Sequence, residues 1–242
     1  MNFQINITYD GTDFSGWQIQ DNVRTVQNDI QSSIREIFKN DSIKLLGSGR
    51  TDAGVHATGQ VANFVIDTKM TPEQIKNAIN SKIKNDIYIN GCKIVKPEFN
   101  ARYMATSREY IYKISKKSNP INRRYCWYVS NDIDKKKLNE CARMILGTHN
   151  FILFCKALSI KEDNNCRIEK SEWNFKEEMY CYTICANRFL HHMVRILVGT
   201  MIEIGKNSMP INIFEKMLNV NINNPRIINA PAHGLYLNKV EY

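Results

Sequence analysis

The segment from residue 46 to residue 64, LGSGRTDAGVHATGQVANF, holds the residue types best suited to chemistry in this chain. Four glycines surround Arg50 and Asp52, which are two residues apart. Residues at this spacing in an extended segment project to the same side, and a carboxylate near a guanidinium stays ionised. An ionised carboxylate acts as a nucleophile or as a general base. The segment therefore predicts one of these two roles for Asp52.

An ordinary turn is the alternative interpretation of this segment. Gly47, Gly49 and Gly54 permit positive φ, and aspartate is a common turn residue. The density of glycine between two strand-like runs favours instead a loop that brings its backbone close to a ligand. The segment has no Gly-Lys-Ser/Thr ending and the chain has no G-x-G-x-x-G, which excludes a P-loop and a dinucleotide fingerprint.

The run NRFLHHMVRILVGTMIEIG predicts a long helix over residues 189–204, apolar on most sides and therefore largely buried. Its narrow polar face is lined, at spacings of four, three and four, by Arg188, His192, Arg195 and Gly199. An uncompensated interior charge costs roughly several kcal/mol. We therefore predict that Arg195 pairs with Asp52, the alternative being that its long side chain reaches solvent or a phosphate.

The histidines and cysteines do not predict a metal centre. His191 and His192 would face different directions on a helix, and no third ligand has a suitable spacing, so we expect phosphate contact or packing for both. The seven cysteines are scattered and include no C-x-x-C pair, which excludes a zinc ribbon and a redox motif. We expect reduced, mostly buried thiols in a reducing compartment.

Charge and aromatic residues favour nucleic acid as a partner. The formal net charge is +9, although a lysine-rich surface gives the same value. In EYIYKIS, Tyr110 and Tyr112 share a strand face; one could stack on a nucleobase in a cleft, although most such pairs pack in a core. The most concentrated positive charge follows in Lys113, Lys116, Lys117, Arg123 and Arg124. This cluster predicts phosphate contacts, a solvated surface being the alternative.

Hydrophobic periodicity predicts the elements that must position these residues. In the first half we expect strands over 3–9, 42–46, 59–66 and 87–95, and helices over 26–38 and from Thr71 onward. Thr71, Pro72 and Gln74 match an N-cap, a first-turn proline and a capping-box partner. In the second half we expect strands over 109–115, 126–130, 168–175, 180–186 and 235–240, and helices over 134–146, 189–204 and near 214.

This order predicts an α+β protein with two similar lobes of mainly antiparallel β-sheet backed by helices. The lobes are expected over residues 1–105 and 106–242, with the active-site cleft between them. The chain enters a strand at once and shows neither a signal-peptide pattern nor an apolar run of about 18 residues. We therefore expect a soluble, cytoplasmic protein without a membrane partner.

Five blocks resemble the TruA family of tRNA pseudouridine synthases. The specific one is GRTDAGVHATGQVANF, and the others are YDGTDFSGWQIQ, RYMATSREYIYKI, FLHHMVRILVG and APAHGLYL. The resemblance implies the pseudouridine synthase fold and isomerisation of uridine to pseudouridine in the tRNA anticodon arm, nominally at positions 38–40. It also implies a homodimer that needs neither a metal nor an organic cofactor.

The resemblance implies a role for five residues. Asp52 is the catalytic aspartate, Arg195 pairs with its carboxylate, and Tyr110 stacks against the target base. Arg50 helps to extrude the nucleotide or holds a phosphate, and Leu235 packs on the ring from below. Whether Asp52 attacks C6 of uracil, attacks C1′ or removes the C2′ proton stays open.

The chain also departs from the pattern of many relatives. Ile196 follows Arg195 where many carry asparagine, residues 150–154 read NFILF in place of DFTSF, and the R-T-I stretch reads CRIEKSEW around Arg167. None of these changes removes a proposed chemical group. Three other functions stay open: a paralogue with a shifted RNA target, a noncatalytic tRNA-binding or folding protein, and a glycosidase that releases the base.

Overall fold

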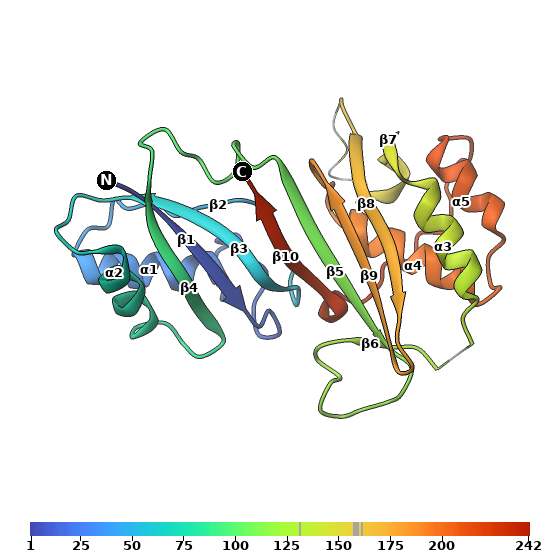
Figure 1. Ribbon diagram of the computed structural model, residues 1–242, viewed down its shortest axis with the longest axis horizontal. Helices are drawn as coiled ribbons and strands as arrows, with labels where there is room; N and C mark the ends of the chain where they lie inside the picture. The colour runs from blue at the N-terminus through green and yellow to red at the C-terminus, as the bar shows by residue number, and fades with distance from the viewer. Residues whose placement is uncertain (131, 157–159, 161) are drawn as a thin grey trace. The chain divides into compact units, whose positions relative to one another are not determined.

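The computed structural model describes residues 1–130, 132–156, 160 and 162–242. The chain separates into two compact units, Met1–Thr106 with Tyr236–Tyr242, and Ser107–Leu235. In each unit helices cover one face of a mainly antiparallel sheet (Figure 1). This confirms the predicted α+β class. Among the described residues, no helix combines the length and the apolar character needed to cross a membrane.

The first unit is built around strand β1. Its elements are β1 (Asn2–Tyr9), α1 (Val26–Phe38), β2 (Leu46–Gly47), β3 (His56–Val65), α2 (Pro72–Asn80), β4 (Ile87–Val95) and β10 (Leu235–Glu241). Strands β3 and β4 flank β1, both antiparallel to it, and β2 pairs with β3. Phe3, Ile5 and Ile7 alternate along β1 and are fully buried. They form the core between this sheet and its two helices.

Side chains of α1 replace the strand that periodicity predicts over residues 42–46. Only Leu46 and Gly47 pair as β2, so that prediction is wrong for the preceding residues. Gln31 Oε1 accepts a hydrogen bond from Leu45 N at 2.9 Å, and Gln27 Nε2 donates to Leu45 O at 2.8 Å. These bonds satisfy the backbone without a neighbouring strand. The alternation of buried and exposed residues is therefore present without a β-ladder.

Strand β10 lies far in sequence from the strand with which it pairs. It runs parallel to β3, with Tyr236 opposite His56 and Leu237 opposite Ala57. The sequence predicts that these residues belong to the second lobe, over 106–242. In the structure, Tyr236–Tyr242 belongs to the first unit. A Cβ at Gly59 would lie 2.1 Å from Asn238 O, so the backbones approach closely there. Nothing local in the sequence signals such a long-range parallel pairing.

The second unit is a sheet of order β5-β9-β8-β7, with β6 paired parallel to β5. Its elements are β5 (Ser107–Ser115), β6 (Trp127–Tyr128), α3 (Lys135–Met144), β7 (Gly147–Asn150), β8 (Asn165–Phe175), β9 (Met179–Ala186), α4 (Met193–Gly205) and α5 (Ile211–Leu218), with short 3-10 helices at Ile152–Phe154 and Ala232–Gly234. The predicted β8–β9 hairpin is present, and β7 was not predicted. The helices α3, α4 and α5 cover one face of this sheet (Figure 1).

Helix α4 is as buried as predicted but begins four residues later. Eleven of its thirteen residues are buried. His192, expected inside the helix, has φ of 66° and caps it instead. Met193 N donates to Leu190 O at 3.1 Å, which makes a turn of the preceding residues. Of the predicted polar face, Arg195 and Gly199 therefore lie on α4, and Arg188 and His192 do not.

Candidate active site

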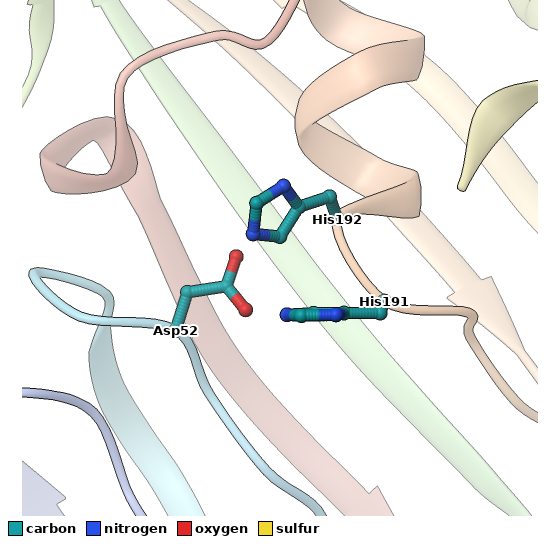
Figure 2. A group of neighbouring side chains, drawn as sticks. All are labelled: Asp52, His191 and His192. Atoms are coloured by element: carbon teal, nitrogen blue, oxygen red, sulfur yellow. The ribbon is translucent and has the colours of Figure 1, made fainter. Parts of the chain in front are cut away.

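Asp52 lies in the loop between β2 and β3. Its carbonyl oxygen accepts a hydrogen bond from Val55 N at 3.2 Å, and Gly54 between them has φ of 76°. The side chain of Asp52 is half-buried, whereas Arg50 is exposed. Figure 2 shows the Asp52 carboxylate extending away from the loop backbone. The turn thus presents a carboxylate that is only partly buried.

The segment that follows β1 holds one side of this loop. Trp17 N donates to Thr51 O at 3.1 Å, and the buried hydroxyls of Tyr9 and Thr51 are 2.8 Å apart. Gly16 has φ of 94°, and a Cβ there would lie 2.6 Å from Thr51 O. The residue before Asp52 is therefore fixed through both its backbone and its side chain.

The same segment holds the other side of the loop. Gly11 N donates to His56 Nδ1 at 3.0 Å, and a Cβ at Gly11 would lie 2.0 Å from Val55 O. His56 is 2% exposed, and its ring stacks on Tyr236 with 4.8 Å between centroids. The support that these residues give to Asp52 was not predicted from the sequence. The two glycines of DGTDFSGW were the available signal, because each allows a close backbone approach.

Arg195 is held in place through both its backbone and its side chain. Its Nε donates to Ala230 O at 2.8 Å, and Ala230 N donates to its carbonyl oxygen at 3.1 Å. A Cβ at Gly199, one turn later, would lie 2.2 Å from Ile228 O. Burial raises the pKa of the nearby Tyr112 phenol, and the positive charge of Arg195 opposes that rise. The guanidinium is therefore a fixed cation at a half-buried position.

His191 and His192 lie on the segment that enters α4 (Figure 2). His192 Nδ1 is 2.9 Å from Asn229 Nδ2, and the carbonyl of His191 accepts from Lys156 N at 3.1 Å. Their rings lie 4.3 Å apart at 67°. Neither histidine lies within the helix, so the two rings are not held in the different directions that adjacent helical residues take. The expectation that no metal binds stays a prediction.

Tyr110 and Tyr112 share one face of β5, as their spacing predicts. Both are buried, and Tyr110 meets the edge of Phe189 at 5.1 Å between centroids. Leu235 is 5% exposed and follows directly after the short helix Ala232–Gly234. In this structure Tyr110 packs edge-on against Phe189, as core residues do, and its stacking on a target base stays a prediction.

The predicted basic cluster extends from β5 into the loop that precedes β6. Arg123 and Arg124 are exposed, and Lys113 and Lys116 are half-buried. Arg123 Nη1 donates to Pro120 O at 2.5 Å, and Lys117 forms an ion pair with Glu178. These side chains present positive charge to solvent on one strand and its loop. Such a surface suits phosphate contacts, and it equally fits the alternative of a solvated face.

Comparisons with known proteins place these features in context. The family model described as tRNA pseudouridine synthase matches residues 5–104 and 141–242. A curated tRNA pseudouridine synthase A from Brachyspira hyodysenteriae is 42% identical, covering 98% of this chain and 97% of that protein. Proteins of the same name from Dictyoglomus thermophilum and a Geobacillus species are 38% and 36% identical, covering 100% and 98% of this chain and 100% and 96% of their own lengths.

Proposed function

The chain belongs to the tRNA pseudouridine synthase family, and we propose that it isomerises uridine to pseudouridine in the anticodon arm of tRNA, nominally at positions 38–40. The reaction breaks the C1′–N1 bond, turns the uracil in place and forms a C1′–C5 bond, while C5 loses its proton and N1 gains one. It therefore requires a nucleophile or base beside the ribose, and a pocket that retains the free ring.

Asp52 is the group that we propose for this chemistry. The observation that carries the proposal is a half-buried carboxylate on a loop held at both ends, at Thr51 by Trp17 and at His56 by Gly11. A rigid loop keeps the reacting oxygen within reach of the substrate, which lowers the cost of orientation in the transition state. Three routes fit this carboxylate equally: addition to C6, attack on C1′, and removal of the C2′ proton.

We assign the remaining residues to supporting roles. Arg195 is assigned to pair with the Asp52 carboxylate, and the hydrogen bond from its Nε to Ala230 O, which fixes the guanidinium, supports this role. Tyr110 stacks on the everted base, a contact worth about 1–3 kcal/mol. Leu235 packs on the ring, and Arg50 holds the extruded nucleotide or its phosphate.

Electrostatic contacts would offset the cost of moving the uridine out of its stack, on the order of a few kcal/mol. The net charge of +9 and the exposed arginines of the basic cluster support such contacts. We assign phosphate contacts to Lys113, Lys116, Arg123 and Arg124, and to His191 and His192 ahead of α4. A homodimer that works in the cytoplasm without a metal or cofactor completes the proposal.

A substitution of Asp52 tests the proposal. D52N keeps the shape of the side chain and removes its charge, so the variant should fold, bind tRNA and form no pseudouridine. Activity is measured by tritium release from tRNA carrying C5-labelled uridine, with mapping of the modified positions. D41N is the matched control, because Asp41 is an exposed aspartate of the same unit, and it should retain full activity.

Three outcomes would contradict the proposal. Full tritium release by D52N would remove Asp52 from the chemistry. Release of free uracil, in place of a product of unchanged mass with a carbon-linked base, would identify a glycosidase. Tight tRNA binding without tritium release by the parent protein would instead indicate a noncatalytic RNA-binding protein.

A further inference from the structure

The second unit contains a cavity of about 240 Å³ beside the loop that joins β5 to β6. Its lining includes Lys117, Ser118, Asn119, Arg123, Trp127 and His233. No residue given a role in the chemistry of the target uridine is among the residues that line it. The cavity is therefore lined by two cationic side chains, an imidazole, a hydroxyl, an amide and an indole.

One buried ring supports two walls of the cavity. Tyr112 is fully buried; its ring contacts Trp127 edge-on at 6.2 Å between centroids, and its Oη donates to Pro231 O at 2.7 Å. A Cβ at Gly234 would lie 2.6 Å from the Tyr112 ring. His233 is held between Pro231 and Gly234. The indole wall and the imidazole wall are therefore fixed by the same side chain.

The loop that closes the cavity is ordered by its own hydrogen bonds. Ser115 Oγ donates to Lys117 O at 2.6 Å, and Tyr125 N donates to Asn122 O at 2.8 Å. Cys126, whose Sγ donates to Asn122 O at 3.3 Å, also lines the cavity. These bonds order the loop from within, so binding would require little further ordering of the backbone.

The two cations are accessible to an anion. Lys117 pairs with Glu178, but their side chains are 71% and 55% exposed, and an ion pair of that kind contributes little. Arg123 Nη1 donates a hydrogen bond to Pro120 O. A guanidinium has five N–H donors in a fork that fits a phosphate, so others can contact one. Trp127 is half-buried and has Lys206 Nζ 5.7 Å from its ring centroid. Indole rings stack on any nucleobase.

We propose that this cavity binds a second nucleotide of the RNA substrate, with its phosphate held by Arg123 and Lys117 and its base against Trp127. Ser115 at the cavity is five residues from Tyr110 along β5, or roughly 17 Å. The nucleotide in the cavity is therefore different from the one that Tyr110 stacks. A second contact at that distance would fix the register of the RNA strand. The inference rests on the proposed function, since it takes RNA as the ligand.

Salt dependence tests the phosphate contact. The affinity for an unmodified tRNA transcript is measured by fluorescence anisotropy at several salt concentrations, for the parent, R123Q and R143Q. Arg143 is an exposed arginine of the same unit on α3, outside the cavity, and serves as the matched control. Losing one phosphate contact should make the slope of log K against log salt shallower by about one. We expect this change for R123Q, with affinity lowered about 3- to 10-fold, and no change for R143Q.

Tryptophan fluorescence tests the base contact. The chain has three tryptophans; Trp17 and Trp173 are 2% and 8% exposed, whereas Trp127 is half-buried and lines the cavity. Addition of tRNA should quench the fluorescence of the parent, and W127F should lose most of that quench. Phenylalanine keeps an aromatic ring against Tyr112, and circular dichroism checks that the variant is folded.

The outcomes separate this inference from the proposed function. Equal salt slopes for R123Q and R143Q, or an unchanged quench in W127F, would overturn it even if the parent makes pseudouridine. The expected slopes and quench in a parent that makes no pseudouridine would support the cavity and contradict the proposed function. Inorganic phosphate or uridine monophosphate that quenches Trp127 at the concentration of tRNA would indicate a small-molecule site and overturn the RNA assignment.

Discussion

At the scale of single residues, the glycines around Asp52 differ in what they do. Gly16 has φ of 94°, and a Cβ there would lie 2.6 Å from Thr51 O, whereas a Cβ at Gly49 would meet nothing within 4 Å. The left-handed region costs a non-glycine residue roughly 1–2 kcal/mol, and the clash adds to that cost. We predict that G16A lowers the free energy of unfolding by at least about 2 kcal/mol, and that G49A changes it by less than about 0.5 kcal/mol.

The same pair tests whether the loop positions Asp52. Because Gly16 contacts the residue before Asp52, G16A should also lower kcat under conditions where the variant is fully folded. Urea unfolding and tritium release are measured on both variants. If G49A proved as damaging as G16A, the support of Thr51 by Gly16 would not explain the loop. If G16A kept the parent's kcat while folded, the support would be structural only.

The sequence identified the loop but not its supports. Asp52 and Arg50 stand out because charged residues among glycines are unusual, and that signal is local. Gly11 and Trp17 contact the loop across about 35 to 45 positions of sequence. A single sequence holds no information on contacts at that separation unless the residue types are themselves distinctive. Glycine is also common in turns, so Gly11 and Gly16 predict only a simple turn and not a contact with the Asp52 loop.

At the scale of elements, threonine occupies two helix N-caps, and substitutions at these two positions should have different effects on the free energy of unfolding. Thr71 accepts a hydrogen bond from Gln74 N and completes a capping box on α2. Thr25, at α1, makes no side-chain cap bond, and its buried Oγ1 has no hydrogen-bond partner among the described residues. We predict that T71A lowers the free energy of unfolding by about 1 kcal/mol. T25V, which removes an unsatisfied hydroxyl, should leave it unchanged or raise it by up to about 1 kcal/mol.

Urea unfolding of the two variants at pH 7 measures both effects, with T25A as a control. Alanine at position 25 removes the methyl group together with the hydroxyl and leaves a void, so T25A should be less stable than T25V. A loss of stability in T25V comparable to that in T71A would mean that the Thr25 hydroxyl does cap α1.

Local signals decided which element predictions succeeded. The capping box of α2 was predicted from three adjacent residues, and the helix begins there. The start of α4 was misplaced because apolar periodicity continues through Phe189 and Leu190, while the positive φ of His192 leaves no trace in the pattern. The strand before β2 was misplaced because side chains of α1 take the place of a neighbouring strand.

At the scale of the whole molecule, the order of elements was predictable and the grouping of the last strand was not. Periodicity located the long strands of both units, most clearly β8 and β9, in which buried residues alternate with more exposed ones. The parallel pairing of β10 with β3 joins Tyr236 to His56 across the length of the chain. That pairing places an aromatic ring on His56, and so connects the end of the chain to the support of Asp52.

Partly and fully buried thiols in the two units make the free energy of unfolding decrease at alkaline pH. Burial raises the pKa of Cys92 in the first unit to about 11, and that of Cys141 and Cys166 in the second to about 12 and about 11, from the ordinary value of 9.0. The folded thiols keep their protons where the unfolded thiols lose them. Their contribution is therefore complete below pH 9 and falls as the pH rises toward 11 and 12. We predict that the free energy of unfolding declines across this window under reducing conditions.

Cys141 on α3 provides the sharpest test, because it is 0% exposed. Between its unfolded and folded pKa values, one retained proton corresponds to about 1.4 kcal/mol per pH unit. C141A should therefore show a decline shallower by up to that amount in urea unfolding between pH 8 and pH 10.5. L138A, a cavity-forming change on the same helix, should lower stability at every pH and keep the parent's slope. Parallel curves for C141A and the parent would show that the Cys141 thiol ionises as easily in the folded protein as in the unfolded chain.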